Sequence, residues 1–126
     1  MMKKTILITG CAGFIGYHLT KYLTKNRDNH IIGIDNMFTG SISNLNKLKK
    51  LENFEFIRHD VVFPIYIEVD EIYHLASPAS PIYYQLIPIK TVKTNLLGTL
   101  NMLGLAKRMK CKILFTSTSE VYGNPA

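Results

Sequence analysis

Three glycines near the start of the chain, Gly10, Gly13 and Gly16, follow a short apolar run and precede a segment with helical patterning. A strand that enters a glycine turn and then a helix directs the free N–H groups and positive dipole end of that helix at one point. Such a point binds a pyrophosphate, because glycine allows a tight turn and a close approach of the backbone. The spacing is Gly-x-x-Gly-x-x-Gly, so the triplet alone is a weak sign of dinucleotide binding.

Asp35 strengthens this interpretation. It ends the next apolar run, about twenty residues beyond the glycines, where a carboxylate can accept hydrogen bonds from the adenosine ribose hydroxyls. No Arg or Lys follows Asp35 directly. The pattern therefore predicts NAD as the cofactor, in preference to NADP.

A second group of reactive side chains lies near the end of the chain. Residues 116–119 carry four hydroxyls, and Glu120 adds a carboxylate. A hydroxyl here can hydrogen-bond a substrate oxygen that gains or loses a proton, and Glu120 can hold a water molecule or a carboxyl group. The segment predicts acid–base chemistry beside a nicotinamide.

The elements that must position these residues alternate along the chain. Strand-like runs are expected at 4–9, 30–35, 54–59, 70–75 and 112–117, and helical patterns at 14–26, 42–50 and 88–110. Right-handed crossovers then give an α/β fold, a Rossmann-type doubly wound parallel sheet of order 3-2-1-4-5. Ligands bind such a sheet at the carboxyl ends of its strands, so the site residues should follow each strand. We expect residues 1–126 to form one partial NAD-binding domain whose sheet stops after the fifth strand.

Composition narrows the remaining possibilities. A chain of 126 residues with 47% hydrophobic content can bury one core. The net charge is +6, but the 15 Lys and Arg residues are spread along the chain, which favours an anionic small ligand over nucleic acid. Cys11 and Cys111 are far apart, and the four histidines lack ligand-like spacing, so neither a disulfide nor a metal site is expected. Apolar runs are too short for a membrane span, and we predict a cytoplasmic protein.

The pattern at 88–110 predicts a long helix with Pro88 in its first turn. Its apolar residues recur at helical spacing and are expected to pack in the core: Ile89, Val92, Leu96, Leu100, Leu103, Ala106 and Met109. Its charged arc is open to two interpretations, a solvated face or a cationic wall beside the cleft. Because the expected sheet stops at its fifth strand, residues 113–115 should be partly exposed and could associate with another chain.

Taken together, these segments resemble the N-terminal portion of the extended short-chain dehydrogenases, and most closely the UDP-glucuronate decarboxylases. The resemblance runs almost end to end, and its most particular motifs are Ser-Pro-Ala-Ser-Pro at 77–81, Asn-Met-Leu-Gly-Leu-Ala-Lys-Arg at 101–108 and Thr-Ser-Glu-Val-Tyr-Gly at 118–123. It implies NAD-dependent decarboxylation of UDP-glucuronate to UDP-xylose through a 4-keto intermediate. It also implies a homodimer in the complete enzyme.

Site residues follow from the resemblance, position by position. Those implied to bind NAD are Gly10, Gly13, Phe14, Ile15, Gly16, Asp35, Asn36, Phe38, Thr39, Gly40, Asp60, Val61, Leu75, Ser77 and Thr116. Those implied to face the sugar nucleotide are Ile65, Tyr66, Lys93, Asn101, Gly104, Lys107 and Arg108. Thr118 would be the hydroxyl of the catalytic set, with Ser119 and Glu120 contributing to decarboxylation.

In this family a Tyr-x-x-x-Lys pair supplies the general base, and the resemblance places that pair beyond Ala126. We therefore expect the 126 residues alone to be inactive. Two alternatives remain open: another NAD-dependent sugar-nucleotide 4-epimerase or 4,6-dehydratase, and a non-catalytic NAD-binding fragment. The dehydratase motif carries an acidic Asp where this chain has Ser119, which disfavours that alternative.

Overall fold

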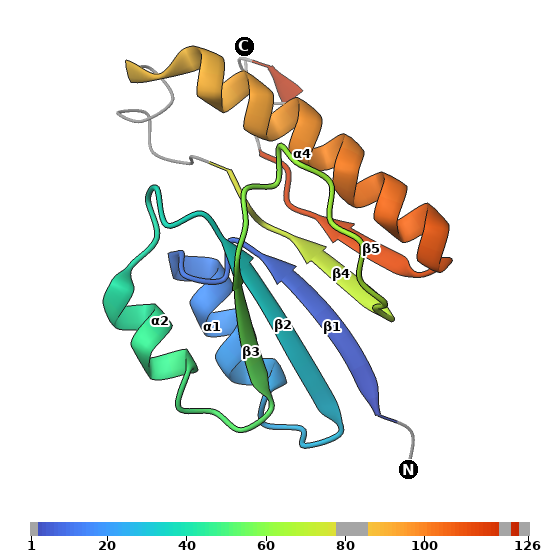
Figure 1. The fold of residues 1–126 in the computed structure, drawn as a ribbon. Helices are drawn as coiled ribbons and strands as arrows, with labels where there is room; N and C mark the ends of the chain where they lie inside the picture. Colours follow the sequence, from blue (N-terminus) through green and yellow to red (C-terminus); the bar gives the residue numbers. More distant parts are fainter. Residues whose placement is uncertain (1–2, 78–85, 119–121, 124–126) are drawn as a thin grey trace.

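The strands of this protein form one parallel sheet, shown in Figure 1. The computed structural model describes residues 3–77, 86–118 and 122–123. The elements in chain order are β1 (Lys4–Thr9), α1 (Phe14–Leu23), β2 (Asn29–Asp35), α2 (Ile42–Leu48), β3 (Phe54–Arg58), β4 (Glu71–His74), α4 (Pro88–Met109) and β5 (Lys112–Phe115). The strand order is β3-β2-β1-β4-β5, and all four pairings are parallel, which confirms the predicted doubly wound topology.

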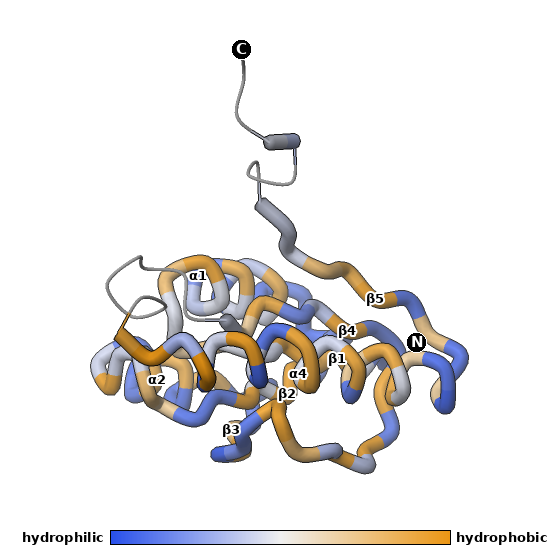
Figure 2. Tube along the Cα trace, turned by 90° about the horizontal axis from the view of Figure 1, so that it is seen from above, coloured by the Kyte–Doolittle hydropathy of each residue, from blue (hydrophilic) through white to orange (hydrophobic). Residues whose placement is uncertain are grey.

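Both faces of the sheet are covered, because side chains alternate between the two faces along each strand. In β1, Ile6 and Ile8 pack with α1 and α2, whereas Leu7 packs on the opposite side with α4. Figure 2 shows hydrophobic segments along β5 and on α4. This three-layer arrangement leaves the carboxyl edge of the strands for the loops that form the site.

Helix α4 corrects one prediction from the sequence. Of the apolar residues expected in the core, Ala106 is buried and Met109 packs against the core, but Ile89, Val92, Leu96, Leu100 and Leu103 are exposed. The other buried residues of the helix are Thr94, Gly98, Met102 and Leu105. The reason is close packing, since a Cβ at Gly98 would lie 2.6 Å from Cγ2 of Val61. Small residues let this face approach the sheet, and the larger apolar stripe is turned outward.

Strand β5 pairs with β4 and is poorly covered. Leu114 and Phe115 are about half exposed, and Ile113 is partly buried, as expected for this strand. Apolar side chains are therefore exposed both on β5 and along the outward stripe of α4.

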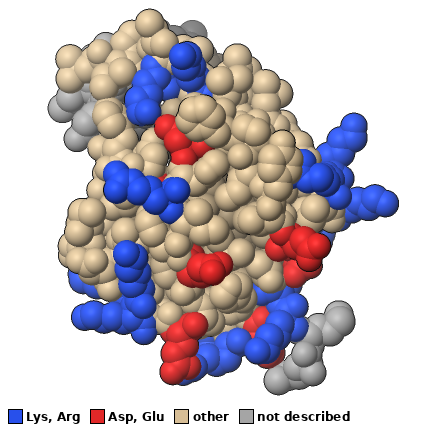
Figure 3. All heavy atoms as spheres, in the orientation of Figure 1, with Lys and Arg blue, Asp and Glu red and all other residues tan. Residues whose placement is uncertain are grey.

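The structure describes the state of the cysteines, possible metal-binding groups and possible membrane-spanning helices for the described residues only. There Cys11 and Cys111 are free, and no group of three His, Cys, Asp or Glu side chains is placed to hold a metal ion. Within the same residues, no helix has the length and apolar character needed to cross a membrane. Figure 3 shows Lys and Arg spread over one face of the molecule with acidic groups between them.

Candidate functional site

The glycine turn links β1 to α1 at the carboxyl edge of the sheet. Gly10 has φ +73°, a conformation that residues with a Cβ rarely adopt, and a Cβ there would lie 3.1 Å from the backbone of Ala76. Gly13 is the N-cap of α1 and provides no side-chain cap for the first N–H groups of the helix. Those donors and the positive end of the helix dipole are therefore available to an anion beside the turn.

Asp35 ends β2 and joins the two parts of this site. Its Oδ2 accepts a hydrogen bond from the Ala12 N–H at 3.0 Å, and its Oδ1 accepts one from the Met37 N–H at 2.8 Å. Gly40 lies against the same carboxylate, since a Cβ there would be 3.1 Å from Oδ1. Each carboxylate oxygen can accept a further hydrogen bond, which is what recognition of a ribose diol requires.

A buried network supports the loop after β4. The Oγ1 of Thr9 accepts hydrogen bonds from the N–H groups of Leu75 and Ala76, both at 2.9 Å, and lies 2.8 Å from Nδ1 of His74. The two N–H donors occupy the lone pairs of the hydroxyl, so its proton is donated to Nδ1. Burial lowers the pKa of His74 to about 4, so the ring is neutral at physiological pH. His74 thus serves as a neutral acceptor that holds the loop after β4.

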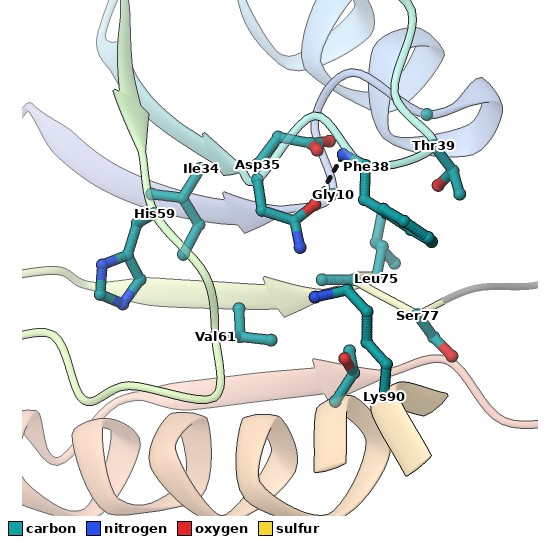
Figure 4. A pocket seen from close by; sticks show the side chains of 14 residues that line it. Gly10, Ile34, Asp35, Phe38, Thr39, His59, Val61, Leu75, Ser77 and Lys90 are labelled. Carbon is teal, nitrogen blue, oxygen red and sulfur yellow. Dashed lines mark hydrogen bonds between the residues drawn. The ribbon is translucent and has the colours of Figure 1, made fainter. Parts of the chain in front are cut away.

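These loops enclose a pocket above the strand ends (Figure 4). The residues that line it are Gly10, Gly13, Ile34, Asp35, Asn36, Phe38, Thr39, His59, Val61, Leu75, Ala76, Ser77, Lys90 and Thr94. Nine of them belong to the set that the resemblance implied for NAD: Gly10, Gly13, Asp35, Asn36, Phe38, Thr39, Val61, Leu75 and Ser77. Residues from four separate strand ends are therefore brought together where the winding of the sheet reverses.

The rest of the predicted cofactor set lies around this pocket. Phe14 and Ile15 are exposed at the start of α1, and Gly16 is buried beneath the turn. Asp60 contacts two pocket residues, Asn36 and Lys90. Thr116 donates from Oγ1 to the carbonyl of His74 at 3.4 Å.

Two polar residues of α4 line the pocket and were missed in the sequence. Thr94 is 5% exposed, and its Oγ1 is a buried polar atom without a hydrogen-bond partner among the described residues. Lys90 reaches from the first turns of α4 toward Phe38 (Figure 4). The signal for both was a polar residue at positions 90 and 94, one helical turn apart, on the opposite side from the apolar stripe.

The residues implied to face the sugar nucleotide are not among those lining this pocket. The guanidinium of Arg108 donates to the carbonyl of Ile65 at 3.2 Å and lies 4.6 Å from the ring centroid of Tyr66. Asn101 donates from Nδ2 to the carbonyl of Val61 at 2.8 Å. Three others, Lys93, Gly104 and Lys107, are exposed along α4.

Of the residues implied for catalysis, Thr118 is described and exposed after β5. Ser119 and Glu120 lie outside the described residues. The spacing Tyr-x-x-x-Lys does occur once within the chain, at Tyr17 and Lys21. Tyr17 lies on the buried face of α1, in the core, and does not line the pocket. The Lys21 ammonium lies 6.0 Å from the centroid of the Tyr17 ring. This pair is therefore not placed to act as a base there.

Comparison with known proteins agrees with this geometry. The model of the GDP-mannose 4,6-dehydratase family matches residues 7–126. The chain belongs to this family. The membership confirms the resemblance to extended short-chain dehydrogenases that the glycine turn, Asp35 and the strand-end motifs carried.

Individual relatives of the chain indicate its similarity more closely than the family description does. The chain is 62% identical over 120 residues to UDP-glucuronic acid decarboxylase 6 of Arabidopsis thaliana, and 60% identical over 124 residues to UDP-glucuronic acid decarboxylase 1 of Danio rerio. The two matches cover 95% and 98% of this chain, but only 35% and 29% of the relatives. The chain thus spans about a third of the length of the curated relatives it matches.

Solved structures of two sugar-nucleotide epimerases share the fold of this chain. A variant of UDP-glucuronic acid 4-epimerase from Bacillus cereus, in complex with a fluorinated UDP-glucuronic acid and NAD, superposes with a TM-score of 0.86 at 34% identity, over 97% of this chain and 42% of that one. The UDP-N-acetylglucosamine 4-epimerase of Methanobrevibacter ruminantium superposes with a TM-score of 0.85 at 33% identity, over 99% and 41%.

Proposed function

We propose that this chain is the NAD-binding part of a UDP-glucuronate decarboxylase, which converts UDP-glucuronate to UDP-xylose through a 4-keto intermediate. The observation that carries the proposal is the meeting of the glycine turn and Asp35 in one pocket at the carboxyl edge of the sheet. Decarboxylases are the relatives at about 60% identity, whereas the epimerase structures are near one-third identity, which favours decarboxylation over epimerisation.

The residues present fit this cofactor. The uncapped start of α1 suits a pyrophosphate, and Asp35 suits a ribose diol. The buried hydroxyl of Thr94 needs a partner, since an unpaired buried polar atom costs about 1–3 kcal/mol. A polar group of a bound dinucleotide would satisfy it.

When bound, NAD⁺ supplies reversible hydride transfer at C4 of the sugar. The role of the described residues is to bind and orient this cofactor. Gly10 and the N-terminus of α1 would hold the phosphates, Asp35 the adenosine ribose, and Ser77 the region near the reacting end, where its hydroxyl donates to Oδ1 of Asn95. Thr118, Ser119 and Glu120 follow β5 and would supply the hydroxyls and the carboxylate that act on the substrate.

The test of cofactor binding is Asp35→Ala. We expect its dissociation constant for NAD⁺ to rise roughly ten- to hundredfold, because removing a charge-assisted hydrogen bond costs about 1.5–3 kcal/mol. Calorimetric titration of the 126-residue chain measures this. The control is Glu52→Ala, which removes the same charge from an exposed ion pair with Arg27 and should leave binding unchanged. Equal affinities of Asp35→Ala and the parent chain would contradict the assignment.

We further propose that the protein forms a homodimer through the outward apolar stripe of α4. This stripe consists of five exposed apolar side chains on one side of the helix: Ile89, Val92, Leu96, Leu100 and Leu103. A soluble monomer usually exposes such side chains singly, so a contiguous stripe indicates an interaction surface. The pairing of two such helices would bury it.

Light scattering at tens of micromolar tests the dimer. The parent chain is expected to be larger than a monomer, and the double variant Leu96→Lys/Leu100→Lys should shift it toward the monomer, because charges on the stripe oppose its burial. A monodisperse monomer of the parent chain, with a cooperative thermal transition, would refute the proposal.

The protein is proposed to act in the cytoplasm, with UDP-glucuronate as its substrate and without a nucleic-acid partner. Its two cysteines are free, and burial, with a smaller contribution from the charge of Asp35, raises the pKa of the Cys11 thiol to about 12. A thiol held in that form is unreactive, as suits a reduced cysteine beneath a binding turn.

A further inference from the structure

One face of α4 fixes the position of the loop that follows β3. The Nζ of Lys90 lies 3.4 Å from Oδ2 of Asp60. Gly98 packs against Val61, and Asn101 donates to the Val61 carbonyl at 2.8 Å. Positions 90, 98 and 101 share one side of a helix. The helix therefore holds the Asp60-Val61 pair through three separate contacts.

Of the three helix residues, Lys90 is the one that lines the pocket. Its ammonium lies 5.2 Å from the ring centroid of Phe38, so the side chain crosses from α4 to the loop after β2. Figure 4 shows it extending between Val61 and Phe38. The side chain is 32% exposed, against 21% for Asp60, so the ion pair is partly shielded from water. Partial burial makes such a pair stronger than one on an open surface.

Asp60 is held by several donors. Its Oδ1 accepts from the Val62 N–H at 3.1 Å, and its Oδ2 accepts from Nδ2 of Asn36 at 3.3 Å as well as from Lys90. Burial alone would raise the pKa of Asp60, but the hydrogen bonds from Val62 and Asn36 and the charge of Lys90 outweigh it and lower the pKa below its ordinary value. Asp60 is therefore an ionised acceptor with a defined orientation.

We propose that Lys90 is a positioning residue for the adenine end of the site: it holds Asp60 as an acceptor for the exocyclic amino group and so makes the site select adenine over hypoxanthine. This inference rests on the proposed NAD function and on the resemblance, which implies that the Asp60 carboxylate meets the adenine amino group. Adenine presents an N–H donor where hypoxanthine presents a carbonyl oxygen. A fixed carboxylate pairs with the first and repels the second. A released carboxylate could turn away and would discriminate less.

The experiment compares NAD⁺ with nicotinamide hypoxanthine dinucleotide by calorimetric titration of the 126-residue chain. The parent chain should prefer NAD⁺ by about tenfold or more, as expected for one hydrogen bond to a charged group. Lys90→Met should weaken NAD⁺ binding several-fold and bring the preference close to one. Lys90→Arg keeps the charge and should restore most of the preference. Lys49→Met is the matched control, because Lys49 also lies over an aromatic ring, that of Phe56 at 5.5 Å, and does not line the pocket.

A second variant keeps the test decisive if Lys90→Met does not fold. Asp60→Asn carries an amide that can donate to the hypoxanthine carbonyl, so its preference should move in the same direction. Equal weakening of both dinucleotides in Lys90→Met would overturn the proposal, because Lys90 would then add only positive charge. NAD⁺ binding by the parent chain with an unchanged preference in both variants would overturn it as well, leaving the proposed function intact. A parent chain that binds neither dinucleotide would overturn both.

Discussion

Replacing Gly16 by alanine is expected to cost the chain at least about 3 kcal/mol of folding free energy and to abolish dinucleotide binding. A Cβ at Gly16 would lie 2.0 Å from the carbonyl oxygen of Gly10 and 2.8 Å from its carbonyl carbon. Both are backbone atoms, so no side-chain rotation relieves the overlap. Helix α1 must move away from the turn, and the arrangement that would hold the pyrophosphate is lost with it.

The matched control is Gly104→Ala, the same substitution inside α4. A Cβ at Gly104 meets no atom within 4 Å. Alanine is favoured over glycine in a helix by about 0.8–1 kcal/mol, so this variant should be slightly stabilised. Thermal unfolding measures both, and the Gly16 variant should melt roughly 10 °C or more below the parent chain. If the two variants melted together, the close packing of α1 on the turn would be disproved.

The glycine motif illustrates what could be predicted from the sequence. Gly10, Gly13 and Gly16 are constrained by local backbone geometry, and a local constraint leaves a local spacing in the chain. The strand order followed for a similar reason, since apolar runs alternating with helical patterns allow few topologies. Asp35 was found because it ends a strand at a distance from the turn that one βαβ unit dictates.

Helix α4 shows what periodicity could not reveal. Its outward stripe is more apolar than its inward face, where Thr94 and Gly98 allow close approach to the sheet. Hydrophobic spacing identifies the stripe but not the side on which the sheet lies. Lys90 and Thr94 were missed for the same reason, because only the docking of the helix turns them toward the pocket.

The Tyr17 and Lys21 pair shows the opposite error, in which a sequence pattern is present but its residues do not lie at the site. Its spacing matches a catalytic motif, yet α1 buries Tyr17 against the sheet. A motif of two residues carries chemistry only when the elements around it open onto a site. The residues implied for the sugar nucleotide, among them Asn101 and Arg108, were placed by resemblance alone and remain a prediction.

The second large effect concerns acid. Stability of the parent chain is expected to fall by about 2 kcal/mol between pH 7.5 and pH 5, and by about 3 kcal/mol in full, because of His74 alone. The pKa of this buried ring is about 4 in the folded chain, against 6.5 for an ordinary histidine. Between these two values the unfolded chain binds the proton and the folded chain does not. The stability is thus fully present above pH 6.5, is lost as the pH falls, and levels off near pH 4.

The contacts of His74 explain why the folded chain rejects the proton. Nδ1 accepts from the hydroxyl of Thr9, whose lone pairs already accept the N–H groups of Leu75 and Ala76. A proton on Nδ1 would face a hydroxyl with no lone pair to offer, so the ring could charge only by breaking the network under the β4 loop. His74→Asn retains an acceptor oxygen for Thr9 without a titrating group. It should be less stable at pH 7.5 but should show a shallower decline toward pH 5.

Urea unfolding of both chains at a series of pH values measures the two slopes, and their difference cancels the other titrating groups. Resonances of the His74 ring, followed by NMR through the same range, provide an independent reading of the proton. Parallel slopes, or a ring that titrates between pH 6 and 7, would show that the Thr9–His74 network does not exclude the proton. The loop that carries Leu75, Ala76 and Ser77 would then have to be held at the pocket by its other contacts.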